Sequence, residues 1–266
     1  MKSAKNKAQN DYTLITGASS GIGEAAAREL AKNKQCLILT ARRMERLKKL
    51  QRQCIELGAK NIFIYKLDVQ NKKEIASLVA EIKKKKIKIK VLINCAGLAK
   101  GTELFQNSQS IHNEEMLDTN VKALLNITRE LLPSLIQNKG HIVNIGSVAG
   151  RLVYEGGTVY CATKFAVRAI SEGLRMDLKG TGVRVTNIEP GMVHTEFSLV
   201  RLGNQQNAEA VYRDMMPLSA IDIANSILWC LSQPPHVNIS ELVIYPTDQA
   251  SVGQVVRGEK SIKYLR

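Results

Sequence analysis

Tyr160 and Lys164 are the residues of this sequence whose types and spacing most directly predict chemistry. They are four positions apart, so on a helix their side chains lie one turn apart on the same face. A free phenol titrates near about 10, and a neighbouring ammonium favours its ionised form, so this spacing predicts a general acid/base at Tyr160 with a lowered pKa. Ser147, which follows an apolar run, adds a hydroxyl that can hold and polarise a carbonyl oxygen. The three residues together predict a carbonyl or hydroxyl as the reacting group.

A glycine-rich loop near the start of the chain predicts a dinucleotide site. It lies between a predicted strand at residues 11–16 and a helix-favouring run at residues 24–30. Backbone N–H groups of such a turn can approach a pyrophosphate, and the N-terminus of the helix adds a favourable dipole. The loop residues predicted to bind the cofactor are Gly17, Ser19, Ser20, Gly21, Ile22 and Gly23.

The end of the second predicted strand indicates which dinucleotide is bound. NAD sites commonly place an acidic residue about 20 positions after the glycine loop, where it binds the ribose 2′-hydroxyl. Arg42 and Arg43 stand there instead, and a guanidinium can bind a 2′-phosphate through paired hydrogen bonds. NADP is therefore the predicted cofactor. The alternative is that the two arginines are exposed residues that only begin the next helix.

The remaining chain alternates between strand-like and helix-like segments. The predicted strands are residues 11–16, 36–39, 61–66, 91–93, 141–145, 183–188 and 241–245, and the predicted longer helices are residues 44–57, 71–87, 111–138, 157–179 and 221–232. This order predicts a doubly wound α/β fold of Rossmann type, with a seven-stranded, mostly parallel sheet and helices on both faces. The length predicts one domain, residues 11–266, after a frayed basic lead-in at residues 1–10.

Ligands of such a fold bind at the carboxyl ends of the strands, and this is where the motifs fall. Small residues after the fourth strand leave room for a nicotinamide ribose, and the end of the third strand lies beside the adenine. The further cofactor contacts predicted at strand ends are Asp68, Val69, Asn94, Ala96, Gly97, Pro190, Gly191, Val193 and Thr195.

Composition and charge exclude several other classes of protein. The net charge is +14, but the densest basic run, residues 83–90, closes a predicted helix where cations suit the dipole, and aromatic residues are only 5%. A nucleic-acid partner is therefore not predicted. No apolar run approaches the roughly 18 residues of a membrane span, and residues 1–10 lack the apolar segment of a secretory signal. The five cysteines have no metal-ligand spacing, which predicts reduced thiols, no metal site and a cytoplasmic protein.

Assembled, these motifs resemble the short-chain dehydrogenase/reductase family over residues 11–257. The glycine loop matches the family's cofactor loop, residues 94–97 match its Asn-x-Ala-Gly turn, and Asn120 matches its relay asparagine. The resemblance implies that Tyr160 transfers the proton while Lys164 lowers the tyrosine pKa and holds the nicotinamide ribose. It also implies that Ser147 orients the carbonyl and that Asn120 keeps a water linking Lys164 to solvent. A homotetramer packed through the helices at residues 111–138 and 157–179 is implied as well.

A narrower resemblance concerns the substrate. Residues 141–151, 154–157, 180–186, 195–201 and 235–239 are similar to the NADP-dependent 3-hydroxy acid dehydrogenases. This implies a short 3-hydroxy acid or semialdehyde, whose carboxylate needs a cationic partner. Arg151 and Arg201 are the candidates, with a substrate lid at about residues 192–215. The alternative for both arginines is an exposed surface position.

Two other functions stay open at this point. Leu152 replaces a bulkier residue of some relatives, so an enlarged pocket would favour reduction of larger ketoacyl, steroid or xenobiotic carbonyls. A non-catalytic NADP-binding protein is the other, although such a protein does not require Ser147, Tyr160 and Lys164.

Overall fold

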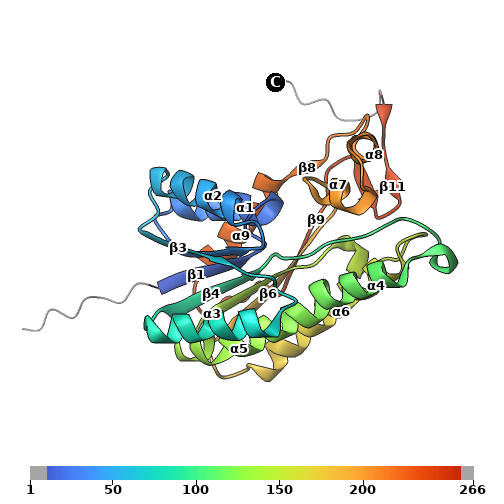
Figure 1. Cartoon of the computed structure of the whole chain (residues 1–266). Helices are drawn as coiled ribbons and strands as arrows, with labels where there is room; N and C mark the ends of the chain where they lie inside the picture. Colours follow the sequence, from blue (N-terminus) through green and yellow to red (C-terminus); the bar gives the residue numbers. More distant parts are fainter. Residues whose placement is uncertain (1–10, 259–266) are drawn as a thin grey trace, which may run out of the picture.

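A seven-stranded sheet forms the centre of the protein (Figure 1). The computed structural model describes residues 11–258, so the predicted lead-in at residues 1–10 lies outside the described residues. The strand order is β3-β2-β1-β4-β5-β6-β9, and every neighbouring pair is parallel. The predicted fold class is confirmed. The strands are β1 (Asp11–Thr16), β2 (Cys36–Ala41), β3 (Asn61–Lys66), β4 (Lys88–Asn94), β5 (His141–Ile145), β6 (Arg184–Pro190) and β9 (Glu241–Ile244).

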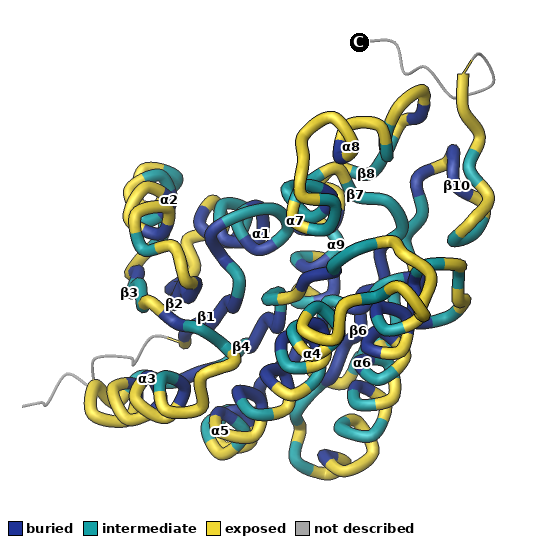
Figure 2. The backbone as a smooth tube through the Cα atoms, turned by 45° about the vertical axis from the view of Figure 1, so that its right-hand side comes forward, coloured by how far each residue is buried: buried dark blue, intermediate teal, exposed yellow. Residues whose placement is uncertain are grey.

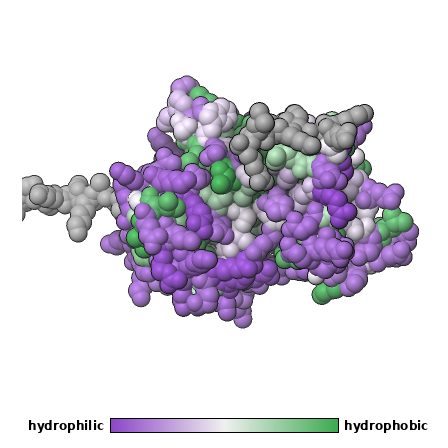
Figure 3. Space-filling model, turned by 90° about the horizontal axis from the view of Figure 1, so that it is seen from above, coloured by the Kyte–Doolittle hydropathy of each residue, from purple (hydrophilic) through white to green (hydrophobic). Residues whose placement is uncertain are grey.

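Helices cover both faces of the sheet (Figures 1 and 2). One face carries α1 (Gly21–Lys32), α2 (Met44–Glu56) and α9 (Ala220–Ser232), and the other carries α3 (Lys72–Lys84), α5 (Leu124–Gln137) and α6 (Thr158–Asp177). Most of the outer surface seen from above is hydrophilic, with separate hydrophobic spots (Figure 3). The helices therefore bury one apolar side each against the sheet and face water with the other.

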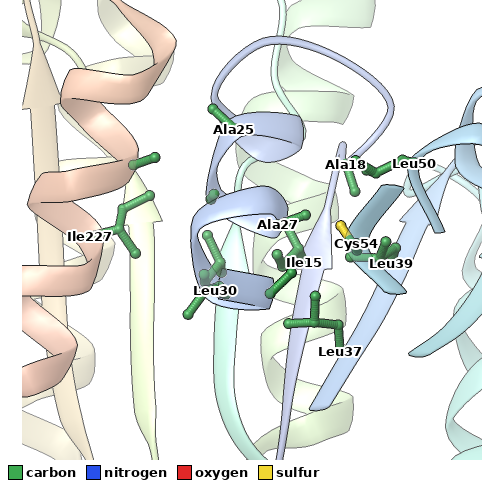
Figure 4. Close-up of a cluster of buried hydrophobic side chains, with 14 of the residues drawn as sticks. Ile15, Ala18, Ala25, Ala27, Leu30, Leu37, Leu39, Leu50, Cys54 and Ile227 are labelled. Atoms are coloured by element: carbon green, nitrogen blue, oxygen red, sulfur yellow. The ribbon is translucent and has the colours of Figure 1, made fainter. Parts of the chain in front are cut away.

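The two faces of the sheet build two separate apolar cores because neighbouring side chains of a strand point to opposite faces. Ile15 of β1 belongs to the core under α1, α2 and α9, whereas the adjacent Leu14 belongs to the core under α3 and α5. Figure 4 shows Leu30 of α1 between Ile15 of β1 and Ile227 of α9, with Ala27 of α1 next to Ile15. Strands buried on both faces are continuously apolar, which is why the sequence marks them clearly.

The strand order reverses direction between β1 and β4. The chain moves outward from β1 through β2 to β3, then returns to pair β4 with β1. After β1 and β4 the chain continues to helices on opposite faces of the sheet, and such a reversal of strand order forms a ligand crevice at the carboxyl edge. This edge carries the glycine loop and the small residues that follow β4.

The predicted continuous helix at residues 111–138 is wrong in one respect. It consists of α4 (Ser110–Leu117), a π-helical segment η2 (Asp118–Ala123) and α5 (Leu124–Gln137). The π-helical segment contains Asn120. Its side-chain oxygen accepts from the Leu98 N–H, and its side-chain NH2 donates to the Leu98 carbonyl. A tertiary contact thus falls within the π-helical segment, and such segments occur frequently at functional sites.

Residues 193–219 and 249–255 form a wall over the carboxyl edge of the sheet. It includes β7 (Val193–His194), which pairs with β8 (Leu218–Ser219), and the short helices α7 (Phe197–Leu202) and α8 (Gln205–Ala210). The strands β10 (Gln249–Ser251) and β11 (Gln254–Val255) form an antiparallel pair. Two short 3-10 turns, η1 (Phe105–Asn107) and η3 (Val148–Gly150), complete the described elements.

Within residues 11–258, no helix has the length and apolar character required to cross a membrane.

His141, at the start of β5, is a buried neutral histidine. Its Nε2 lies 2.7 Å from the Thr186 hydroxyl oxygen, and that hydroxyl donates to the Ile239 carbonyl at 2.6 Å. The Thr186 proton is thereby used, so Nε2 of His141 carries the hydrogen and donates. Burial, assisted by the charge of Arg184, lowers the pKa of His141 to about 3.

We expect the free energy of unfolding to decrease as the pH falls from about 6.5 toward 3. Over this range the unfolded chain binds a proton at His141 and the folded protein does not, so protonation favours unfolding. The loss from this residue is about 4 kcal/mol. Urea unfolding at several pH values measures it. The variant His141→Gln should show a shallower dependence on pH, and an unchanged slope would contradict this role.

Candidate active site

The predicted catalytic residues meet in one cavity at the carboxyl edge of the sheet. Ser147 follows β5 and begins η3, while Tyr160 and Lys164 project from the first turns of α6. All three line a cavity of about 530 Å³. Ser147 is hydrogen-bonded to the Tyr160 phenol. Lys164 Nζ donates to the Ile145 carbonyl at 2.9 Å and lies 5.8 Å from the centroid of the Tyr160 ring.

The pKa of Tyr160 is raised, which corrects the expectation that Lys164 lowers it. Tyr160 is 8% exposed, and its burial disfavours the phenolate more than any other influence. The neighbouring Tyr154 raises the pKa further, whereas the Ser147 hydrogen bond and the Arg201 charge oppose this shift. Helical spacing does place the Lys164 ammonium near the Tyr160 ring, but burial has the larger effect on the pKa of the phenol. Tyr160 is therefore a protonated acid at neutral pH.

Burial has the opposite effect on the Lys164 ammonium. It lowers the pKa of Lys164 to about 8, because the charged form loses its hydration. The carbonyl of Ile145 accepts one of the three ammonium hydrogens. Lys164 is consequently mostly charged at pH 7, with two donors left to face the cavity.

Asn120 lies beside this pair without lining the cavity. Its amide donates to Leu98 O (2.8 Å) and to the Thr163 hydroxyl (3.1 Å), and its oxygen accepts from Leu98 N (2.9 Å). A Cβ added at Gly97 would lie 3.3 Å from the Asn120 oxygen and 3.9 Å from Lys164 Nζ. Asn120 thus fixes the backbone next to the lysine. Its relay through a water stays a prediction.

The glycine loop forms the floor of the cavity. Gly17 and Gly21 have φ values of +67° and +56°, which side chains rarely adopt. Thr16 Oγ1 accepts from the backbone N–H groups of Cys95 (3.0 Å) and Ala96 (3.1 Å), so the loop after β1 is joined to the turn after β4. A Cβ on Gly17 would lie 2.9 Å from this turn. Only glycine allows the two turns to approach this closely.

Most of the predicted cofactor residues line the same cavity. The residues that do so are Gly17, Ser19, Ser20, Gly21, Ile22, Arg42, Arg43, Asp68, Val69, Ala96, Gly97, Pro190, Gly191, Val193 and Thr195.

Gly23 and Asn94 were predicted as cofactor contacts but lie behind the lining. A Cβ on Gly23 would lie 2.6 Å from the Gly17 carbonyl oxygen, so this glycine supports the loop from below. The Asn94 amide donates to the Thr128 hydroxyl (2.9 Å) and to Asn144 Oδ1 (2.8 Å) inside the fold. Both residues shape the cavity through their neighbours.

Arg43 connects the second strand to the glycine loop. Its guanidinium donates from Nε to the Ser19 hydroxyl (3.2 Å) and from Nη2 to the Ser20 hydroxyl (2.7 Å). Arg42 lines the cavity with an exposed side chain. Two guanidinium groups beside a glycine loop fit an anionic cofactor group such as a 2′-phosphate.

Arg151 is not a substrate contact, and this prediction is corrected. Its Nε donates to Glu189 and its Nη2 donates to Glu241, which also accepts from Arg168 at 3.0 Å. Arg151 does not line the cavity. Because Glu189 is fully buried, its charge requires a partner inside the fold, and Arg151 is that partner.

Arg201 does line the cavity, together with a tyrosine that the sequence did not single out. Arg201 Nη1 donates to the Tyr154 hydroxyl at 2.9 Å, and its Nε donates to the Gly101 carbonyl at 2.9 Å. Its Cζ lies 5.7 Å from the centroid of the Tyr160 ring. Two of its five N–H donors are used in these bonds, so an anion next to Tyr160 could accept from the others.

The chain belongs to the short-chain dehydrogenase family. Residues 11–204 match the family model described as short chain dehydrogenase. This confirms the resemblance drawn from the glycine loop and from Ser147, Tyr160 and Lys164.

Several relatives are similar over nearly the whole chain. Serine 3-dehydrogenase from Agrobacterium fabrum is 46% identical over 92% of this chain and 97% of that protein. Sulfoacetaldehyde reductase 2 from Chromohalobacter salexigens is 44% identical over 91% of this chain and 96% of that protein. The solved closed form of serine dehydrogenase complexed with NADP⁺ aligns with a TM-score of 0.87 at 41% identity, covering 93% of this chain and 100% of that one.

We expect Arg151→Ala to lower the free energy of unfolding by about 3 kcal/mol, because it leaves Glu189 buried without its cation. Chemical denaturation measures the change. The double variant Arg151→Met/Glu189→Leu removes both charges and should recover at least half of the loss. A selective rise in KM for an acidic substrate, with unchanged stability, would instead restore Arg151 to the substrate site.

Proposed function

We propose that this protein is an NADP(H)-dependent oxidoreductase that transfers a hydride between the nicotinamide and a carbonyl or hydroxyl carbon of a short 3-hydroxy acid or semialdehyde. The observation that carries this function is that Ser147, Tyr160 and Lys164 share one cavity with the glycine loop and Arg43. Preference for NADP is supported by the two arginines after β2 and by the NADP⁺ complex of the similar serine dehydrogenase.

The acid/base chemistry follows from the state of the buried residues. When bound, the reduced cofactor supplies the hydride. Tyr160, kept protonated by a raised pKa, donates its proton to the carbonyl oxygen as negative charge develops there. Ser147 donates a hydrogen bond to the same oxygen. Lys164 offers its free ammonium hydrogens to the cofactor ribose, and in the oxidative direction its charge favours the phenolate.

The acidic group of the substrate is proposed to bind Arg201. Serine and sulfoacetaldehyde, named in two of the relatives, both carry an anionic group one carbon away from the carbon that reacts. A carboxylate or sulfonate with that spacing can reach a guanidinium while its carbonyl oxygen contacts Tyr160. The 5.7 Å between Arg201 Cζ and the Tyr160 ring centroid supports this pairing.

The substrate lid is proposed to comprise residues 192–215. Arg201, in α7, accepts from Gly101 N with its carbonyl at 3.0 Å and donates to Gly101 O with its side chain. Within the segment, Tyr212 donates to the Val193 carbonyl at 2.8 Å and so joins its two ends. These contacts support a segment that covers the cavity as one unit.

The position of Leu152 gives no support to the alternative function, a reductase for larger carbonyls. That function depended on an enlarged pocket at Leu152, but Leu152 is exposed and does not line the cavity. The intact arrangement of Ser147, Tyr160 and Lys164 supports a catalytic protein over one that only binds NADP.

The assembly is proposed to be a homotetramer in the cytoplasm. The helices expected at its interface carry exposed apolar side chains, among them Leu117, Leu125, Phe165 and Met176. Exposed groups of this kind favour contact with another chain. Sedimentation equilibrium measures the mass, and a monomer at micromolar concentration would contradict this assembly.

A small panel of matched substrates and cofactors tests the proposed function. We expect oxidation of NADPH with malonic semialdehyde and with sulfoacetaldehyde. The ratio kcat/KM should be about 10- to 100-fold higher with NADPH than with NADH, the value of hydrogen bonds to a charged phosphate. Tight NADPH binding without turnover of either aldehyde would indicate a non-catalytic protein.

Replacement of Arg201 tests the proposed anion contact. We expect Arg201→Ala to raise the KM for malonic semialdehyde about 10- to 100-fold more than the KM for its methyl ester, because only the acid loses a charged hydrogen bond. The ester is the control for effects on the lid, since both substrates meet the same lid. Arg201→Lys keeps the charge and should fall between. An equal change for acid and ester would contradict the assignment.

A further inference from the structure

Glu196 joins two arginines that come from a distant part of the chain. Its Oε2 accepts from Arg43 Nη1 at 3.0 Å, and its Oε1 accepts from Arg46 Nη1 at 2.6 Å. The arginines begin α2, whereas Glu196 lies 150 or more positions later, just before α7. Each oxygen of the carboxylate thus has its own cation.

This bridge connects the two sides of the cavity. Arg43 is bound to Ser19 and Ser20 of the glycine loop, and Glu196 is the N-cap residue of α7 within the proposed lid. The preceding Thr195 lies directly on the loop, since a Cβ added at Gly21 would be 3.4 Å from its side chain. Arg43, Glu196 and the glycine loop all line the cavity. The ion pairs therefore join the start of α7 to the glycine loop, which is the side of the cavity proposed to bind the cofactor phosphates.

The electrostatics favour a stable but exposed contact. Partial burial of Glu196 would raise its pKa, but the hydrogen bonds from Arg46 and Arg43 outweigh that effect and lower the pKa. Glu196 is therefore ionised at neutral pH. The partners are 40% to 48% exposed, so dissolved salt screens their attraction.

Binding of a 2′-phosphate does not require Glu196 to leave its arginines. Arg42, Arg43 and Arg46 bring three positive charges to this side of the cavity, and Glu196 neutralises one of them. A 2′-phosphate of about −2 charge would neutralise the other two. The count allows the carboxylate to stay on Arg43 and Arg46 while a phosphate binds Arg42 and another N–H group of Arg43.

We propose that Glu196 is a positioning residue that fastens the lid to Arg43 and Arg46 and thereby slows release of the bound dinucleotide. This inference rests on the proposed function and deepens it, because it assigns control of cofactor release to a residue outside the catalytic set. Glu196 acts through the two arginines and the lid, without touching the reacting atoms.

The test measures how fast NADPH leaves the protein. Stopped-flow displacement of fluorescent NADPH by excess NADP⁺ gives the dissociation rate constant for wild type and Glu196→Gln. We expect the variant to release NADPH about fivefold faster at low salt, which is the effect of losing exposed ion pairs. The ratio of the variant's dissociation rate constant to that of wild type should fall toward one in about 1 M NaCl, where charges are screened.

Glu45→Gln is the matched control. Glu45 is also on α2 near the arginines, and its exposed carboxylate pairs with Lys48 at 2.8 Å without reaching the lid. The substitution changes the net charge by the same amount and should leave the rate within twofold of wild type. An equal acceleration in both variants would mean that only the general charge matters, which would overturn the proposal.

Arg46→Gln examines the bridge from its other end. It should accelerate release by about twofold, and the double variant Arg46→Gln/Glu196→Gln should release NADPH no faster than Glu196→Gln alone, because both changes break one contact. Slower release from Glu196→Gln would show that the carboxylate competes with the cofactor, and an unchanged rate would show that the bridge does not restrain it; either overturns the proposal.

Failure of the proposed function is distinguishable from failure of this inference. Wild-type protein that binds NADPH but turns over no aldehyde contradicts the oxidoreductase, while its release rates still decide the role of Glu196.

Discussion

Burial of two ionisable side chains is the constraint on which this structure depends. Tyr160 and Lys164 are 8% and 7% exposed, although both must meet a polar substrate and cofactor. Loss of hydration keeps the phenol protonated and brings the pKa of the ammonium to about 8, close to neutral conditions. The fold compensates with few but direct contacts, from the Ile145 carbonyl to Lys164 and from Ser147 to Tyr160. The cavity at the sheet edge encloses this pair, and η2 is bonded to α6 beside it through Asn120 and Thr163.

Most of the fold could be predicted because its signals are local. Strands buried on both faces are continuously apolar, and helices between them repeat their apolar residues at helical spacing, so element type and order follow from the sequence. The π-helical segment around Asn120 could not be predicted this way. No glycine or proline marks residues 118–123, and the partner of the Asn120 side chain, Leu98, lies 22 positions away. Local periodicity contains no information about such a partner.

The site residues, too, could be predicted where they form local motifs but not where their contacts are distant in the sequence. The glycine loop and the Ser147, Tyr160 and Lys164 set are short motifs, and the structure brings them into one cavity. Arg151 was misassigned because its partner Glu241 lies 90 positions away. Tyr154 and Glu196 were missed, because their contacts with Arg201 and Arg43 join residues 47 and 153 positions apart. The lowered pKa expected for Tyr160 was wrong because spacing reports proximity to a charge but not burial.

The central claim is that the buried Tyr160 phenol supplies the proton for carbonyl reduction, and single-turnover kinetics test it most directly. NADPH absorbance is followed after mixing excess protein with malonic semialdehyde, for wild type and for Tyr160→Phe, which removes one hydroxyl and keeps the ring. The account predicts a hydride-transfer rate constant lower by about 100- to 10,000-fold in Tyr160→Phe, with NADPH affinity nearly unchanged. A rate constant within about twofold of wild type would contradict it.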